Sequence, residues 1–204
     1  MTGVRGAVVA VALLASAACS GGPVLEGSAY RDPKLGWSIA APPGGEARWR
    51  RIRVEGSALA LRGPEGELMS LEVHCGGVLA SPEILAHGLR SGIRESEVRE
   101  EREVPVDGRT AWVQVFDARL DGSSGLSSDR SSGLSSDGSS GLSRDRSSAA
   151  EPPVVRVKTV TRVDPPCVSD FVLAAKGAWP EAEAAFDAWW GSFRPGPAAG
   201  GGGR

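Results

Sequence analysis

Alternating apolar and polar positions predict short strands in the first third of the chain. The clearest is LMSLEVHC, residues 68–75, where every second side chain suits a buried face. The residues on that face are Met69, Leu71, Val73 and Cys75. Segments 51–55 and 58–62 alternate in the same way, and GWSIAAPPG at 36–44 combines a short strand with a turn. Glycine-containing turns between the segments predict an antiparallel meander.

Apolar residues spaced three or four apart predict two helices. In the first, Ser81 is a suitable N-cap and Pro82 suits the first helical position. An apolar stripe follows at Leu85, Leu89 and Ile93. We therefore expect an amphipathic helix that packs on the sheet with this stripe.

The second helix is expected near the end of the chain, where it begins at Trp179-Pro180. Its apolar positions, at i, i+3, i+4 and i+7, are aromatic: Phe186, Trp189, Trp190 and Phe193. Adjacent helical residues point about 100° apart. We expect both tryptophans to pack on the sheet, with one of them at its edge.

The remaining strands are expected on either side of a polar insertion. A charged segment at 94–103 predicts a solvated edge, and it leads into VPVDGRTAWVQVF at 104–116. Within the latter, Asp107-Gly108 indicates a two-residue hairpin turn. The strand after this turn is apolar on both faces, which predicts an interior position. Segments 154–163 and 167–175 complete the set of strands.

The insertion, residues 121–148, is a repeat with a period of eight in which each aspartate is followed by Gly or Arg and two serines. It has too few apolar side chains to offset the entropy of ordering it. A calcium-binding repeat is the alternative, but one carboxylate per repeat makes a poor cage for Ca²⁺. We predict a disordered loop that interrupts a single domain at 30–195, followed by a Gly-rich tail at 196–204.

The N-terminus has the features of an export signal. Arg5 supplies positive charge, residues 7–15 an apolar stretch, and residues 16–18 a zone of small side chains. The apolar stretch is shorter than the roughly 20 residues that span a bilayer. We therefore predict a signal peptide at 1–18 and export of the chain.

Ala17, Ala18 and Cys19 resemble the lipobox of bacterial lipoproteins, in which a cysteine receives a diacylglycerol and becomes the mature N-terminus. The resemblance implies that Cys19 carries acyl chains such as palmitate and that residues 19–29 form a flexible tether. Ser16 departs from the motif, which normally has leucine there. The alternative is ordinary secretion with cleavage after Ala17.

The number of cysteines favours lipidation. The chain has 3 cysteines, and an odd thiol is unusual in an exported protein. If Cys19 is acylated, Cys75 and Cys167 remain as an even pair in an oxidising compartment. We predict a disulfide between them, the alternative being two buried free thiols.

Charge and motifs exclude several classes of function. The 23 basic and 25 acidic residues are nearly balanced, which argues against a nucleic-acid partner. His74, Cys75, His87 and Cys167 suggest a zinc site only on paper, since His74 and Cys75 are adjacent on a strand and point to opposite faces. No Gly-x-Ser-x-Gly nucleophile elbow occurs. We predict no catalytic residues, no metal ligands, no cofactor and no enzymatic activity.

The order of elements resembles the PsbP-like family over residues 30–118 and 150–195. The opening strand GWSIAAPPG and the closing AWWGSFRP carry the resemblance. It implies an α+β fold in which an antiparallel β-sheet is flanked by helices, a PsbP-like α/β/α sandwich. The chain also resembles uncharacterised lipoproteins of Gram-negative bacteria. PsbP-like proteins are mostly non-catalytic, and the resemblance implies a binding, assembly or accessory role without assigning functional residues.

These observations predict an envelope lipoprotein with an accessory or binding role. Its partners are expected to be membrane lipid, through acylated Cys19, and an envelope protein. The absence of aspartate directly after Cys19 favours, by resemblance to Gram-negative lipoproteins, the outer membrane, facing the periplasm. The alternative is a freely secreted or periplasmic enzyme or ligand-binding protein with a pocket that the sequence does not reveal.

Overall fold

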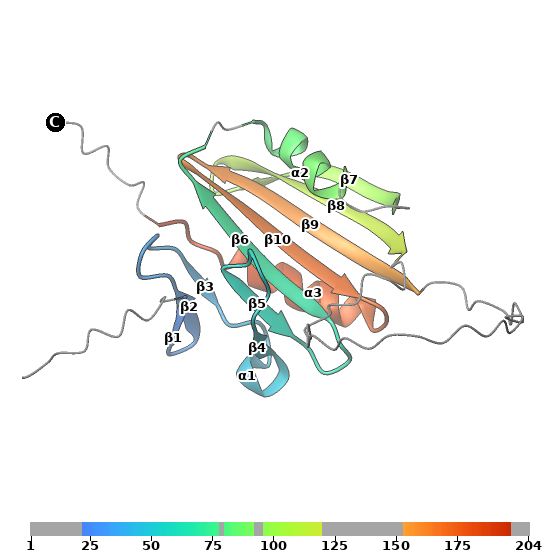
Figure 1. Ribbon diagram of the computed structural model, residues 1–204, viewed down its shortest axis with the longest axis horizontal. Helices are drawn as coiled ribbons and strands as arrows, with labels where there is room; N and C mark the ends of the chain where they lie inside the picture. Colours follow the sequence, from blue (N-terminus) through green and yellow to red (C-terminus); the bar gives the residue numbers. More distant parts are fainter. Residues whose placement is uncertain (1–21, 78–79, 92–95, 120–152, 197–204) are drawn as a thin grey trace, which may run out of the picture.

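A seven-stranded antiparallel sheet forms the centre of the fold. The computed structural model describes residues 22–77, 80–91, 96–119 and 153–196 (Figure 1). The strands of the large sheet are β4 (Arg50–Ile52), β5 (Leu59–Arg62), β6 (Leu68–Cys75), β7 (Ser96–Val106), β8 (Arg109–Arg119), β9 (Val154–Asp164) and β10 (Cys167–Ala175). Their order across the sheet is β4-β5-β6-β10-β9-β8-β7. The predicted signal peptide, Cys19 and the repeats at 121–148 lie outside the described residues.

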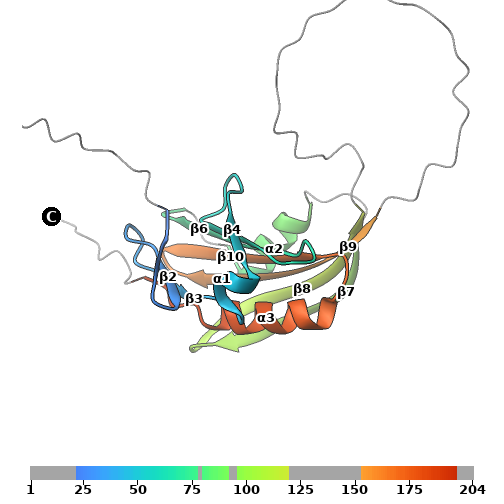
Figure 2. The same cartoon turned by 90° about the horizontal axis from the view of Figure 1, so that it is seen from below.

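Two helices cover opposite faces of this sheet. The helix α2 (Pro82–Ser91) packs on β8 and β9, and α3 (Trp179–Gly191) packs on β9 and β10 from the other side (Figure 2). We call the two surfaces of the sheet the α2 face and the α3 face. This arrangement is the α/β/α sandwich predicted from the sequence.

A second, three-stranded sheet lies beside α3. It consists of β1 (Val24–Glu26), β2 (Ala29–Arg31) and β3 (Ser38–Ala40), and the short helix α1 (Gly45–Arg48) follows it. The strand β1 falls inside the range 19–29 that the sequence assigns to a flexible tether. It is ordered because Leu25 packs against the main core and pairs with Tyr30 on β2. The folded unit therefore begins before residue 30.

The main core fills the space between the α3 face, α3 and the small sheet. Its largest fully buried side chains include those of Trp37, Trp49 and Trp189. Phe171 on β10 contacts both helix tryptophans, with ring centroids 6.1 Å from Trp189 and 6.5 Å from Trp190. Trp189 is buried and Trp190 half-buried, which confirms that both pack on the sheet with one at the edge.

A buried lysine fixes α3 to the sheet. The side chain of Lys158 on β9 is only 4% exposed, and its Nζ lies 2.8 Å from Glu183 Oε1 and 2.8 Å from Asp187 Oδ1 on α3. Asp187 Oδ1 also accepts a hydrogen bond from Trp190 Nε1. These contacts hold the helix over β9 and so determine where the chain emerges after residue 191.

The hairpin between β7 and β8 agrees with the sequence prediction. Asp107 and Gly108 have φ values of 50° and 74°, as a tight turn with two left-handed residues requires. β7 is a mostly exposed edge strand, and β8 is an interior strand buried on both faces. Residues 96–103 of the charged segment are continuous with residues 104–106 in one strand, with a bulge between Val98 and Glu100.

Two further details differ from the predictions. β4 ends at Ile52, so Val54 lies beyond the strand that was expected to extend to residue 55. In α2 the fully buried residue is Ala86, whereas Leu85 and Leu89 are half-buried. A small side chain at Ala86 allows the helix to approach the sheet closely, with the leucines on either side of the contact.

Candidate functional site

Cys75 and Cys167 form a disulfide bond, as predicted. Cys75 ends β6, Cys167 begins β10, and the two are direct partners in the antiparallel register with Cα atoms 4.0 Å apart. Cys75 is exposed and Cys167 half-buried, so the alternative of two buried free thiols is wrong. The bond ties the two central strands together at one end of the α3 face.

A cleft of about 470 Å³ opens beside this disulfide. Its floor is formed by the ends of β6 and β10 and by the turn at Pro165 and Pro166. One wall is formed by the loop at 33–37, between β2 and β3, together with the segment at 193–196, which follows α3 and lies against that loop at Gly196 and Leu35. The apolar part of the lining consists of Leu35, Trp37, Val73, Phe193 and four prolines. This size and composition are typical of small-molecule sites.

The loop wall is held by Asp32. Its Oδ1 accepts hydrogen bonds of 2.7 Å from the backbone N–H groups of Lys34 and Leu35. Gly36 adopts a left-handed φ of 73°, which a residue with a side chain rarely does, and its N–H donates to the Asp32 carbonyl. The loop is therefore closed on itself and holds Trp37, which is fully buried, in the main core beneath the cleft.

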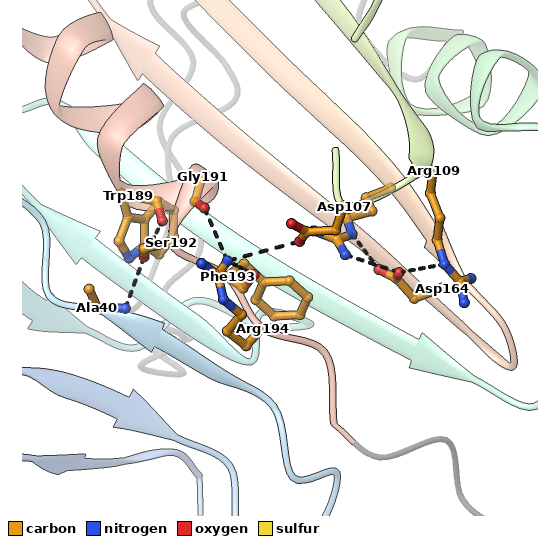
Figure 3. Close-up of polar contacts among 10 residues, drawn as sticks. Ala40, Asp107, Arg109, Asp164, Trp189, Gly191, Ser192, Phe193 and Arg194 are labelled. Carbon is orange, nitrogen blue, oxygen red and sulfur yellow. Dashed lines mark hydrogen bonds and ion pairs between the residues drawn. The ribbon is translucent and has the colours of Figure 1, made fainter. Parts of the chain in front are cut away.

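The segment at 193–196 is joined to the small sheet. Ser38 and Arg194 exchange backbone hydrogen bonds of 2.9 and 2.8 Å. Ala40 N–H donates to Ser192 Oγ at 3.0 Å (Figure 3). These bonds place Phe193 between the sheet and the loop, with its ring centroid 6.1 Å from that of Trp37. With the disulfide across the floor, the cleft is formed before any ligand arrives.

A cluster of arginines and aspartates borders the cleft (Figure 3). The buried Arg162 donates from Nε and Nη2 to the two carboxylate oxygens of Asp164, at 2.5 and 3.2 Å. Its Nη1 reaches Asp107 Oδ2 at 3.3 Å, and its guanidinium lies 6.0 Å from the ring centroid of Phe193. Bidentate pairing of this kind fixes both groups and leaves Asp164 without a free oxygen.

Two more arginines contact the same carboxylates. Arg109 Nε lies 3.4 Å from Asp164 Oδ1, and Arg194 Nη1 lies 4.0 Å from Asp107 Oδ2. The side chain of Arg109 is 49% exposed and lines the cleft together with Lys34. In the part of the chain that the structure describes, Asp164 is the one carboxylate paired with the Arg109 guanidinium, and no carboxylate is paired with Lys34 Nζ. The rim of the cleft is therefore positively charged.

The histidines proposed for a metal site are not gathered here. His74 lies on the α2 face, opposite to the disulfide, with its Nε2 3.0 Å from Glu72 Oε1. His87 is on α2, with its Nε2 3.5 Å from Glu101 Oε1. Within the described ranges, no three His, Cys, Asp or Glu side chains come together as a metal site would require.

Among the residues that the structure describes, two carboxyl groups have shifted pKa values, and neither lines the cleft. Burial raises the pKa of Asp170 on the α2 face, partly opposed by the 2.7 Å hydrogen bond that Thr161 donates to it. The hydrogen bond from Arg156 is the main cause that lowers the pKa of Asp117, which also accepts from Arg99. Both groups are engaged in structural pairs away from the apolar lining.

Sequence reasoning identified the disulfide but missed the cleft and its charged rim. Lys34, Arg109 and Asp164 are far apart in the sequence, and no motif connects them. The one sequence feature that points to this site is Asp164, a charged residue directly before the Pro165-Pro166 turn where β9 ends. Only the register of the sheet and the return of the chain after α3 bring these groups together.

The fold and the cleft define the class of protein: an α/β/α sandwich with an apolar cleft and a basic rim. Among solved structures, it is similar to the solution structure of cyanobacterial PsbP (CyanoP) from Synechocystis sp. PCC 6803. That match has a TM-score of 0.51 and 15% sequence identity, and it covers 82% of this chain and 91% of the other. The protein therefore has the PsbP-like fold predicted from its sequence.

Comparison of the sequence itself gives no further assignment: no family model matches, and no curated protein matches. Among the helices in the described residues, none is both long and apolar enough to cross a lipid bilayer.

Proposed function

We propose that this protein is a lipid-anchored lipoprotein of the bacterial cell envelope and acts there as a non-catalytic accessory or binding module. The cleft beside the Cys75–Cys167 disulfide would be its binding site. The observation that carries the binding role is the pre-formed apolar cleft of about 470 Å³, whose walls are tied by backbone hydrogen bonds and whose floor is cross-linked.

The pairing of the cysteines supports the anchor. With Cys75 bonded to Cys167, Cys19 is left without a cysteine partner in its own chain. A disulfide also favours an oxidising compartment, in agreement with export. Acyl chains on Cys19 would explain the third cysteine, and more than one chain on that residue would give stable attachment to a membrane.

The chemistry of the cleft supports binding rather than catalysis. A general base needs a free carboxylate or imidazole near the reacting group. Both oxygens of Asp164, the carboxylate at the rim, are held by Arg162. The described lining otherwise consists of apolar side chains, a serine, basic groups and the disulfide. These groups can hold and orient a ligand.

Metabolic labelling tests the anchor. Cells of a Gram-negative host that express the full chain are fed an alkyne fatty acid, and the protein is captured and stained. We expect label in the wild type, none in Cys19→Ala, and full label in Cys19-containing controls such as Cys75→Ala/Cys167→Ala. An unlabelled wild-type protein in the soluble periplasm would favour the freely secreted alternative.

Binding of an uncharged probe tests the role of the cleft. N-phenyl-1-naphthylamine fluoresces in apolar sites, and we expect it to bind the full chain carrying Cys19→Ala, which needs no detergent. Val73→Phe fills the floor of the cleft and should abolish binding. His74→Phe adds a ring at the next residue, on the opposite face, and should leave binding unchanged. Equal binding by both variants would exclude the cleft as the site.

A further inference from the structure

The charges around the cleft are unequal. Its carboxylates, Asp107 and Asp164, are each contacted by two guanidinium groups. Arg162 is shared between them, so three arginines face two carboxylates, and Lys34 on the loop wall adds a further positive charge. Asp32, behind the loop, is already engaged with the backbone N–H groups of that loop. A net positive charge therefore remains at the mouth of an apolar cleft.

From this asymmetry we propose that the cleft binds a small amphipathic anion, a free molecule with one carboxylate, sulfonate or phosphate group and an apolar body. The inference rests on the proposed binding function and specifies its ligand class. The anionic group would lie at Arg109 and Lys34, and the apolar body would lie along the accessible apolar lining, which includes Leu35 and Val73.

The orientation follows from the lining. Asp164 ends β9 and Arg109 begins β8, so the two charged groups lie together at one edge of the cleft, whereas Leu35 and Val73 belong to its apolar lining. An apolar body that covers these two side chains removes apolar surface from water, which contributes roughly 25 cal/mol per Å². The anion meanwhile meets the half-exposed guanidinium of Arg109, whose Nε lies 3.4 Å from Asp164 Oδ1.

A cation or an uncharged ligand fits this site less well. As a ligand fills the cleft, water leaves the neighbourhood of Arg109 and Lys34, and their charges become more costly unless an acceptor replaces the water. An anion supplies that acceptor through charge-assisted hydrogen bonds. A cation would add repulsion in the same place, so the cleft discriminates by the sign of the ligand's charge.

Two probes with the same aromatic skeleton test this inference. 8-Anilinonaphthalene-1-sulfonate is N-phenyl-1-naphthylamine with one added sulfonate. In the full chain carrying Cys19→Ala, we expect the sulfonate probe to bind about tenfold more tightly than the uncharged probe, since a hydrogen bond to a charged group contributes roughly that factor. Its advantage should shrink at high salt, which screens exposed charges.

Charge-removing variants locate the effect. Lys34→Gln/Arg109→Gln is expected to weaken binding of the sulfonate probe about tenfold and to leave binding of the uncharged probe unchanged. The control Arg62→Gln/Lys176→Gln also removes one arginine and one lysine, but from exposed positions outside the cleft. It should change the affinity for neither probe. Arg109→Lys keeps the charge and should keep most of the preference. Dodecanoate should displace the sulfonate probe, and dodecyltrimethylammonium should not.

The outcomes separate the two proposals. If neither probe binds, or if Val73→Phe leaves both bound, the binding role of the cleft is wrong and the ligand class is wrong with it. If both probes bind equally and the Lys34/Arg109 variant changes neither, the cleft is a binding site but its ligand is not an anion. If binding appears only after deletion of residues 197–204, the chain's own tail is the occupant and the inference is wrong. If the double variant does not fold, two other results test the ligand class. The preference for the sulfonate probe should shrink at high salt and should be mostly retained in Arg109→Lys, and a preference that is independent of salt would contradict an anion site.

Discussion

Cys75 and Cys167 are directly opposite partners in the register of β6 and β10, the two strands that join the halves of the large sheet. Their sequence separation is 92, and the segment between them contains α2, β7, β8 and β9. One covalent bond at the floor of the cleft thus closes a loop that includes almost half of the sheet. The chain cannot separate β6 from β10 at this end while the bond is intact.

Removal of this bond should destabilise the fold. In the chain-entropy model, a cross-link that closes a loop of this length stabilises the folded state by about 4–5 kcal/mol, and native disulfides typically contribute about 2–5 kcal/mol. We expect Cys75→Ala/Cys167→Ala to lower the free energy of unfolding by an amount in this range, measured by urea unfolding followed by tryptophan fluorescence. A reducing agent should lower the free energy of unfolding of the wild type by a similar amount. An unchanged urea midpoint in both cases would contradict a stabilising role.

Deletion of the repeats should leave the fold intact. β8 and β9 are hydrogen-bonded neighbours up to the pair Arg119 and Val154, so the strands are already adjacent where the insertion begins and ends. Deleting residues 121–148 leaves residue 120 and residues 149–153 to connect them, enough for a hairpin loop. A shorter loop also lowers the entropy cost of closure slightly. We expect a cooperative thermal transition with an unchanged or slightly higher midpoint. A large fall would mean that the repeats contribute to stability.

The strands could be predicted because alternation reports a half-buried surface directly. β6 and β10 coincide with the segments 68–75 and 167–175, since each has one face in the main core and a less buried opposite face. The strands β1 and β2 have three residues each, too few to show any period, and their order depends on packing beside α3. Boundaries such as the end of β4 likewise depend on tertiary contacts that no local pattern records.

The site could be predicted only where it depends on chemistry of single residues. Cysteines have few roles in an exported chain, so counting them was enough to predict the Cys75–Cys167 bond. Arginine and lysine are common on any surface, and nothing local distinguishes Arg109 from Arg99. Its role at the cleft depends on the end of β9 that it faces and on the loop at 33–37 across from it.

Gly63 and Gly88 should respond oppositely to the same substitution. A Cβ atom at Gly63 would lie 2.9 Å from the ring of Trp49 and 2.5 Å from Glu67 Oε2, both of which are buried. Gly63→Ala is therefore expected to cost about 1–3 kcal/mol by overpacking. At Gly88, in the exposed part of α2, a Cβ meets nothing within 4 Å. Gly88→Ala should raise stability by about 0.5–1 kcal/mol through helix propensity. Chemical denaturation of the two variants measures both changes, and equal effects would contradict this packing.

Asp170 should make stability depend on pH. Its carboxyl group, 8% exposed on the α2 face, has a pKa raised above the ordinary 3.8 mainly by burial. The folded state therefore holds this proton more tightly than the unfolded chain does. The resulting stabilisation is complete below the ordinary pKa and is lost as the pH rises through the raised value. Asp170→Asn cannot ionise and can still accept the hydrogen bond from Thr161. We expect it to be more stable than the wild type near neutral pH, with the difference disappearing on acidification.

Asp117 provides the control of opposite sign. Hydrogen bonds from Arg156 and Arg99 lower its pKa below 3.8, so the stabilisation it gives is present above that pH and is lost as the pH falls through the lowered value. Asp117→Asn should therefore be less stable than the wild type near neutral pH, and this difference should shrink toward low pH. Urea unfolding of the three proteins across the range from about pH 3 to pH 7 separates the two carboxyl groups. If Asp170→Asn and Asp117→Asn changed stability with the same sign at neutral pH, the assignment of Asp170 as a buried carboxyl that prefers its proton would be wrong.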